Sequence, residues 1–262
     1  MIICFSGTGN SKDVASRLHD ILGDEVVMIS DERLIHELSD NRVIWVFPIH
    51  GWGMPKAVER AIASASIAGA EDAAHYMVCT CGDDIGMADK LWAKAMGRHG
   101  WLVAAAYSVQ MPNTYVCLPG FDVDSRELET EKLRKMPERV SHITTLISKG
   151  SKESDVVRGA MPWIKSYVLR PPFMKYYTSP KLFSVNANCV GCSRCAKGCP
   201  MHAITMNDRR PVWDDRCTMC LGCYHRCPYH AIGYGSFTSN KGQYARSNIT
   251  FKKQRLQMYK RE

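Results

Sequence analysis

The sequence predicts an α/β protein in which a doubly wound, five-stranded parallel sheet precedes a small cysteine-rich α+β domain. Two observations support this expectation. Over residues 1–150, short apolar runs alternate with helical patterns, whereas over residues 181–235 cysteine, glycine and proline dominate. Strands that alternate with helices along a chain usually pair in parallel, with helices covering both faces of the sheet. The second segment has no pattern long enough for a long helix.

Each expected strand is a short apolar run bounded by turn residues or polar residues. The five runs are residues 1–5, 25–29, 42–47, 74–79 and 101–109. The expected helices fill the gaps between these runs and cover residues 11–22, 54–65, from about 86 to 99, and 125–149. Gly150 follows the last helical pattern and is a plausible C-terminal cap.

Changes in composition divide the chain into four parts. Residues 1–150 form the sheet domain, and residues 151–180, rich in aromatics and proline, form a packed connector. Residues 181–235 form the cysteine-rich domain. Residues 236–262 are basic and weakly patterned, which favours a disordered or domain-wrapping tail over a third domain.

Composition limits the classes of protein to consider. No apolar stretch reaches the roughly 18 residues of a membrane span, and the N-terminus has no basic, apolar leader. With 12 cysteines and no export signal, the chain is expected in the cytoplasm, where clustered cysteines are metal ligands more often than disulfides. The net charge of +8 is scattered along the chain, so we expect no nucleic-acid partner.

A repeated cysteine motif is the strongest signal in the sequence. The pattern C-x2-C-x2-C-x3-C-P occurs once from Cys189 to Pro200 and again, 28 residues later, from Cys217 to Pro228. Three cysteines at three-residue intervals let a tight loop wrap one iron–sulfur cubane, with its backbone N–H groups turned toward the cluster sulfurs. Disulfides or a pair of zinc knuckles are the alternatives. Zinc sites usually pair two C-x2-C units across a longer gap, which disfavours that alternative.

Residues 185–235 resemble a bacterial two-cluster ferredoxin on the strength of this double motif. The resemblance implies two [4Fe–4S] clusters, each of which takes its fourth ligand from the other motif. One cluster is then assigned to Cys189, Cys192, Cys195 and Cys227, and the other to Cys217, Cys220, Cys223 and Cys199. Such ferredoxins are often acidic, whereas residues 181–235 hold seven Lys or Arg and three Asp. We expect this positive charge to raise the cluster potentials.

The segment Phe5-Ser-Gly-Thr-Gly-Asn-Ser11 follows the first strand and opens the first helix. Small residues and a helix N-terminus suit the binding of a phosphate. A Walker A loop is excluded because no GK[ST] follows, and a dinucleotide fingerprint is disfavoured because Lys12 replaces its third glycine. An ordinary helix cap is the remaining alternative. The segment resembles the flavodoxin loop for the FMN phosphate, which implies that Ser6, Thr8, Gly9, Asn10 and Ser11 bind that phosphate.

Two later loops fall where a flavodoxin encloses its flavin ring, at the carboxyl ends of the third and fourth strands. The resemblance implies contacts from Pro48, His50, Gly51, Trp52, Gly53, Gly82 and Asp83. Trp52 either stacks on the isoalloxazine ring or is a packed surface residue. Residues 111–115 after the fifth strand are a structural turn or close the site. Cys4 and Cys79 are expected to be core residues.

The whole chain resembles the EFR-type flavodoxin–ferredoxin fusion proteins of anaerobes. This resemblance implies a flavodoxin-like sheet with strand order 2-1-3-4-5, electron transfer between the clusters and FMN, and no defined substrate. No acid–base constellation stands out, so we expect an electron carrier that passes electrons to an unidentified redox partner protein. The alternatives are a flavin-dependent reductase of a small molecule, a docking module without flavin, and a redox sensor. The sequence leaves the oligomeric state open.

Overall fold

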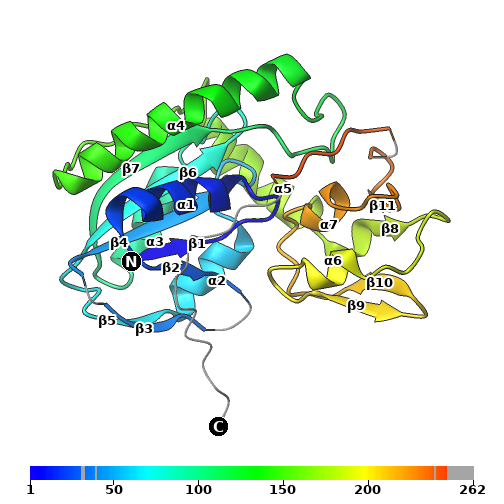
Figure 1. Ribbon diagram of the computed structural model, residues 1–262, viewed down its shortest axis with the longest axis horizontal. Helices are drawn as coiled ribbons and strands as arrows, with labels where there is room; N and C mark the ends of the chain where they lie inside the picture. The colour runs from blue at the N-terminus through cyan, green and yellow to red at the C-terminus, as the bar shows by residue number, and fades with distance from the viewer. Residues whose placement is uncertain (31–32, 39, 239, 247–262) are drawn as a thin grey trace, which may run out of the picture.

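The computed structural model describes residues 1–30, 33–38, 40–238 and 240–246 (Figure 1). Its central sheet has the strand order β2-β1-β4-β6-β7, and every pairing is parallel. The strands are Val26–Met28, Ile2–Cys4, Arg42–Pro48, Ala74–Cys81 and Leu102–Gln110, given in that order. This is the flavodoxin-like order 2-1-3-4-5, so the predicted fold class is confirmed.

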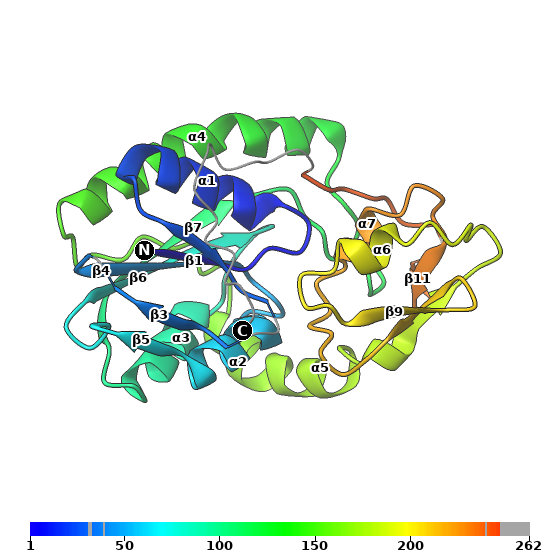
Figure 2. The same ribbon diagram turned by 60° about the horizontal axis from the view of Figure 1, so that its bottom comes forward.

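Two helices cover each face of the sheet. Helices α1 (Asn10–Leu22) and α4 (Arg126–Ser148) lie on one face, and α2 (Lys56–Ser64) and α3 (Ala88–Gly97) lie on the other (Figure 2). Because successive side chains of a strand point to opposite faces, Ile44 packs toward α1 and α4 while Trp45 joins the other core. Both side chains are fully buried, which is why the strands read as continuous apolar runs.

A second, two-stranded sheet was not predicted. Strand β3 (Ile35–Glu37) pairs in parallel with β5 (Ser66–Ala68) beside the main sheet. Each strand is three residues long and largely exposed. Such short segments carry no detectable alternation of apolar and polar residues, so no periodic signal predicts them.

The connector is more ordered than a packed loop. The connector first lies along the edge strand β7. There Asp155 donates its N–H to the Ala106 carbonyl at 2.9 Å and accepts from the Ser108 N–H at 3.1 Å. The π-helix η1 (Ile164–Leu169) then continues directly into α5 (Arg170–Tyr176). Pro171 and Pro172 lack N–H donors, which breaks the normal helical ladder and favours a wider turn. Residues 162–176, all of which are helical, are called the strap helix below.

The cysteine-rich domain is built from two similar halves. Strand β8 (Phe183–Val185) pairs antiparallel with β11 (Ile232–Tyr234), and β9 (Ile204–Asn207) pairs antiparallel with β10 (Arg210–Trp213). Each cysteine motif includes one four-residue helix, α6 (Arg194–Lys197) or α7 (Gly222–His225). The domain sits against the carboxyl ends of the central strands (Figure 1).

The described part of the C-terminal segment wraps the two domains together. Tyr244 is 8% exposed, and Arg246 donates its backbone N–H to the Thr8 carbonyl at 2.8 Å. The rest of the predicted tail, residues 247–262, lies outside the described residues. Within the described ranges, no helix is both long enough and apolar enough to span a bilayer.

Candidate functional site

Two adjoining cavities lie where the carboxyl ends of the central strands meet the cysteine-rich domain. The first has a volume of about 110 Å³ and lies between the loop of residues 6–11, called the phosphate loop below, and residues 218–221. The second, of about 560 Å³, opens toward the strap helix. Gly51, Gly82 and Tyr115 line both cavities, so the two form one continuous site.

The phosphate loop connects β1 to α1 and presents free backbone donors. Ser6 Oγ accepts hydrogen bonds from the N–H groups of Gly9 and Lys12, each at 3.2 Å. Within the described chain, no hydrogen bond engages the N–H groups of the loop residues Gly7, Thr8, Asn10 and Ser11. Unpaired N–H groups at a helix N-terminus suit an anion. The loop therefore fits a phosphate.

Most of the residues predicted to contact FMN lie around these cavities. Those in the first cavity are Ser6, Thr8, Asn10, Ser11, Pro48, His50, Gly51 and Gly82. Trp52 and Asp83 line the second cavity. Gly9 and Gly53 line neither. Gly9 has φ of +108° and faces the Arg246 carbonyl, with which a Cβ at this position would clash.

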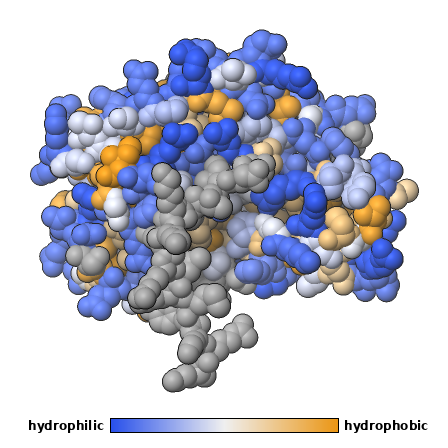
Figure 3. All heavy atoms as spheres, in the orientation of Figure 1, coloured by the Kyte–Doolittle hydropathy of each residue, from blue (hydrophilic) through white to orange (hydrophobic). Residues whose placement is uncertain are grey.

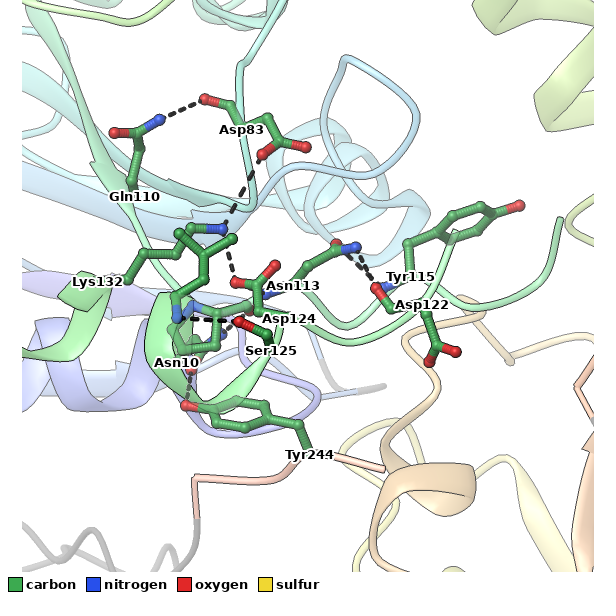
Figure 4. A network of polar contacts seen from close by, with 12 residues as sticks. Asn10, Asp83, Gln110, Asn113, Tyr115, Asp122, Asp124, Ser125, Lys132 and Tyr244 are labelled. Atoms are coloured by element: carbon green, nitrogen blue, oxygen red, sulfur yellow. Dashed lines mark hydrogen bonds and ion pairs between the residues drawn. The ribbon is translucent and has the colours of Figure 1, made fainter. Parts of the chain in front are cut away.

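A polar network holds the phosphate loop against neighbouring segments (Figure 4). The Asn10 amide donates to the Pro112 carbonyl at 2.9 Å and accepts from the Tyr244 hydroxyl at 2.9 Å. Asp124 accepts from the Asn113 N–H and from Lys132 Nζ, at 3.1 and 2.6 Å. The Asn10 side chain thus fixes the loop to residues 111–115 and to the C-terminal segment.

Arg170 of the strap helix shapes the loop after β4. Its guanidinium donates to the carbonyls of His50 and Met54, at 2.6 and 2.9 Å, and pairs with Glu59. An ideal Cβ on Gly53 would lie 2.4 Å from this guanidinium, so a glycine makes room for the arginine. Burial and the charge of Arg170 lower the pKa of His50 to about 4, which keeps its imidazole neutral at pH 7.

The second cavity has aromatic walls that the sequence analysis did not assign to the site. Phe173 and Tyr177 come from the connector, and Phe121 from the loop after β7. Tyr115 packs edge-on against Phe121 and Phe173, with ring centroids 5.4 and 5.7 Å apart. The buried Tyr115 hydroxyl has no hydrogen-bond partner among the described residues. Only the unusual density of aromatics in residues 163–177 hinted at these contacts.

The two cysteine motifs enclose two small apolar cavities of about 20 Å³ each. One is lined by Cys189, Cys192, Cys195 and Cys227. The other is lined by Cys199, Cys217, Cys220 and Cys223. Each cavity thus gathers three cysteines of one motif and the fourth cysteine of the other. Backbone N–H groups approach thiol sulfurs, as in Ala231 N–H to Cys227 Sγ at 3.3 Å.

The chemistry of these thiols fits a cluster better than a single ion. Within the described ranges, no group of three or more His, Cys, Asp or Glu side chains could hold one metal ion, whereas a cubane is ligated at four separated corners. Burial raises the pKa of Cys217 to about 12 and raises that of Cys220 as well. Binding of iron must therefore displace protons from these thiols.

The second cysteine motif touches the phosphate loop directly. An ideal Cβ on Gly7 would lie 2.6 Å from Cys220 Cβ, so only a glycine fits there. Arg226 Nη1 donates to the Gly7 carbonyl, and Thr218 Oγ1 accepts from the Ala57 N–H at 3.0 Å. Cys220 consequently lines both the first large cavity and one cysteine cavity.

Comparison with known proteins identifies one family within the cysteine-rich domain. Residues 188–232 match the family of 4Fe–4S dicluster domains. A search of curated proteins gave no match.

Among solved structures, the Trp repressor binding protein from Bacillus subtilis is 12% identical, with 53% of this chain and 97% of that chain covered and a TM-score of 0.36. A flavodoxin from Streptococcus pneumoniae TIGR4 is 16% identical, with 54% and 97% covered and a TM-score of 0.32. Likenesses this weak carry no functional argument, and the fold assignment rests on the strand order. The chain therefore joins a flavodoxin-like domain to an iron–sulfur domain of the dicluster type.

Proposed function

We propose that this chain is an electron-transfer protein that holds two [4Fe–4S] clusters and one FMN and passes electrons to a redox partner protein. One observation supports this proposal above the others. Cys220, a ligand of one proposed cluster, borders the same cavity as the phosphate loop and touches Gly7. Both cofactors would therefore bind against a shared wall, with no intervening layer of protein.

The proposed cluster ligands follow the two cysteine cavities. Cys189, Cys192, Cys195 and Cys227 would hold the outer cluster, and Cys199, Cys217, Cys220 and Cys223 the cluster beside the sheet domain. Exchange of the fourth cysteine ties the two halves of the domain together. The apolar walls of both cavities limit the access of water to the clusters.

The proposed FMN site uses both large cavities. The N–H groups of the phosphate loop would bind the phosphate, and the loops at residues 48–53 and 80–83 would flank the ring system. When bound, FMN would supply a carrier of one or two electrons beside one-electron clusters. The protein supplies a neutral His50 and the Tyr115 hydroxyl as polar groups in these cavities, and the aromatic walls would limit the access of water to the ring.

Anaerobic purification with analysis of iron, sulfide and flavin tests this proposal. About eight irons, eight sulfides and one FMN per chain are expected. An iron content of about four per chain would mean that only one cluster is bound. A full iron content without flavin, even after reconstitution with FMN, would reduce the sheet domain to a docking module and overturn the proposed transfer between cofactors.

A second candidate function, reduction of a small molecule, is favoured by the size of the second cavity. Its volume of about 560 Å³ and its aromatic walls suit a flat organic ligand beside the flavin ring. Steady turnover of such an acceptor by chemically reduced protein, lost on removal of FMN, would establish this activity. Electron transfer only to protein acceptors would support the carrier.

A further inference from the structure

The strap helix exposes an unusual number of large apolar side chains. Trp163 is 59% exposed and Tyr176 is 61% exposed. Between them, Ile164, Tyr167, Val168 and Leu169 are also exposed. The helix runs along the outside of the protein between the two domains, and no described segment covers its outer side (Figure 2). A continuous exposed apolar surface of this kind marks an interaction site.

The buried side of the strap helix is polar, which reverses the usual arrangement of a surface helix. Ser166 and Arg170 are 2% and 7% exposed. Ser166 Oγ donates to the Trp52 carbonyl at 2.8 Å and accepts from the Met87 N–H at 2.7 Å. Arg170 binds the carbonyls of residues 50–54. The helix is therefore anchored by polar contacts, and its apolar side chains remain available for a partner.

The exposed charged side chains of the strap helix and of the segment directly after it are lysines. Residues 156–207 contain no Asp or Glu, and Lys175 and Lys181 lie in or beside the strap helix. Lys165 is neutralised by its ion pair with Asp84. Lys175 and Lys181 are exposed. Two arginines in the same stretch are used within the fold, since Arg158 pairs with Asp89 and Arg170 pairs with Glu59. The third, Arg194, lies on α6 of the cysteine-rich domain. An exposed apolar face with a lysine fringe is complementary to a negatively charged apolar surface.

We propose that the outer face of the strap helix docks on an anionic lipid surface. Its aromatic residues, Trp163, Tyr167 and Tyr176, have an apolar body and a polar tip, the type enriched at membrane interfaces. Its exposed cations are lysines, which extend from an apolar face to lipid headgroups but are depleted in protein–protein interfaces. The face of the molecule seen in Figure 3 is mostly hydrophilic, with separate apolar patches.

Docking in this way would also orient the candidate site. Leu169, Pro172 and Tyr177 of the same region line the second cavity. The mouth of that cavity would therefore face the lipid surface. The docking itself depends only on the strap helix and needs neither clusters nor FMN.

Co-sedimentation of the full chain with lipid vesicles tests the proposal. We expect the wild type to bind vesicles of phosphatidylglycerol mixed with phosphatidylcholine and to bind pure phosphatidylcholine at least tenfold more weakly. Replacing Trp163→Ser together with Tyr167→Ser should lower the partition coefficient by about tenfold or more, because two apolar contacts are lost. Replacing Lys175→Gln and Lys181→Gln should lower it about fivefold for each charge on anionic vesicles.

Matched variants elsewhere control for general effects of hydrophobicity and charge. Ile21→Ser on α1 and Tyr229→Ser in the cysteine-rich domain remove side chains that are 56% and 47% exposed. Lys149→Gln with Lys152→Gln removes two charges at the end of α4. These variants should bind as the wild type does, and thermal melting should show all variants folded. Failure of the wild type to bind any of these vesicles would overturn the proposal.

Sedimentation of the protein without lipid tests the alternative that another copy of this chain, and not a lipid surface, binds the outer face of the strap helix. Reversible self-association that disappears in the Trp163→Ser, Tyr167→Ser variant would assign the face to another copy of this chain and would overturn lipid docking. A monomeric wild type that binds anionic vesicles supports the proposal. Vesicle binding does not depend on the iron or flavin content of the protein. The proposed docking can therefore be tested separately from the proposed electron transfer.

Discussion

Arg226 Nη1 donates a hydrogen bond to the Gly7 carbonyl at 2.5 Å and so joins the second cysteine motif to the phosphate loop. The same guanidinium donates from Nη2 to the Gly198 carbonyl at 2.6 Å, beside Cys199. One side chain thus contacts the phosphate loop and both cysteine motifs. The contact between the two domains is therefore specified by a charged group and is not only apolar packing.

Arg226→Gln should lower both a cluster potential and the stability of the protein. Loss of a positive charge near a cluster disfavours the more negative reduced state, so the potential should fall by tens of millivolts, on the order expected for one charge at about 10 Å in protein. Loss of charge-assisted hydrogen bonds to two carbonyls should reduce the free energy of unfolding by about 2 kcal/mol. Film voltammetry and anaerobic urea unfolding measure the two effects.

Arg194→Gln is the matched control, because it removes a positive charge from the same domain without breaking a contact between the two domains. Arg194 is exposed on α6 and begins the helix of the other motif. Its replacement should lower a potential without changing the urea midpoint. An unchanged potential in both variants would refute the idea that the positive charge of this domain raises the cluster potentials.

Paired cysteine substitutions test how the two motifs share their ligands. If the fourth cysteines are exchanged, Cys192→Ser with Cys227→Ser damages one cluster only, and about four irons per chain should remain. Cys192→Ser with Cys199→Ser damages both clusters, and the iron content should fall well below four. Anaerobic iron analysis with electron paramagnetic resonance of the reduced protein measures both. The reverse result would mean that each motif holds its own four-cysteine site.

The sequence predicted those features whose signals are local. The strands β4 and β6 are long apolar runs, and their positions agree with the expected 42–47 and 74–79 to within two residues. The strand order followed from the resemblance carried by the loop at residues 5–11. The spacing of the cysteines likewise singled out the residues that line the two small cavities.

Other features depend on contacts between distant residues, which leave no periodic trace. The contact of Tyr244 with Asn10 joins residues 234 positions apart. The aromatic and proline content of residues 151–180 predicts a packed connector and gives no sign of the strap helix. Pro171 and Pro172 disfavour a regular helix, and the wider π turn that precedes them has no simple sequence pattern. The aromatic wall formed by Phe173 and Tyr177 was missed for the same reason.

His75 should make the protein less stable in acid. It is fully buried, accepts from Trp45 Nε1 at 3.1 Å, and contacts the Ala70 carbonyl through Nε2 at 2.9 Å. Burial lowers its pKa in the folded state. Above about pH 6.5 the histidine is neutral in both states, and below that value only the unfolded chain gains the proton. Stability should therefore fall as the pH is lowered through 6.5, by at most about 1 kcal/mol between pH 6.5 and 5.5 from this group.

Urea unfolding at pH 7.5, 6.5 and 5.5 isolates this contribution by comparing variants. His75→Gln removes the titrating group, so its unfolding free energy should change less with pH than that of the wild type. His142→Gln replaces an exposed histidine on α4 and serves as the control. Because other acid-sensitive groups, including the clusters, are common to all three proteins, only the difference in pH dependence is used. Equal slopes for His75→Gln and wild type would contradict the prediction.

Tyr115→Phe should separate a ligand-binding role from a structural one. The Tyr115 hydroxyl is buried without a described partner and lines both large cavities, and burial raises its pKa, so it remains a hydrogen-bond donor. Without ligand, its removal should leave stability unchanged or raise it by up to about 1 kcal/mol, because an unsatisfied polar group is lost. With FMN, the loss of a donor should weaken binding about tenfold.

Titration of flavin-free protein with FMN, followed by quenching of flavin fluorescence, measures this affinity. Tyr107→Phe provides the same chemical change at a buried tyrosine that lines neither cavity, and it should leave FMN affinity unaltered. An FMN affinity in Tyr115→Phe equal to that of wild type would show that the hydroxyl does not meet the flavin. If that variant nevertheless bound a small acceptor more weakly, the hydroxyl would be assigned as a contact of the acceptor in the second cavity. In that case the phosphate loop and the two flanking loops would hold the flavin without help from the hydroxyl.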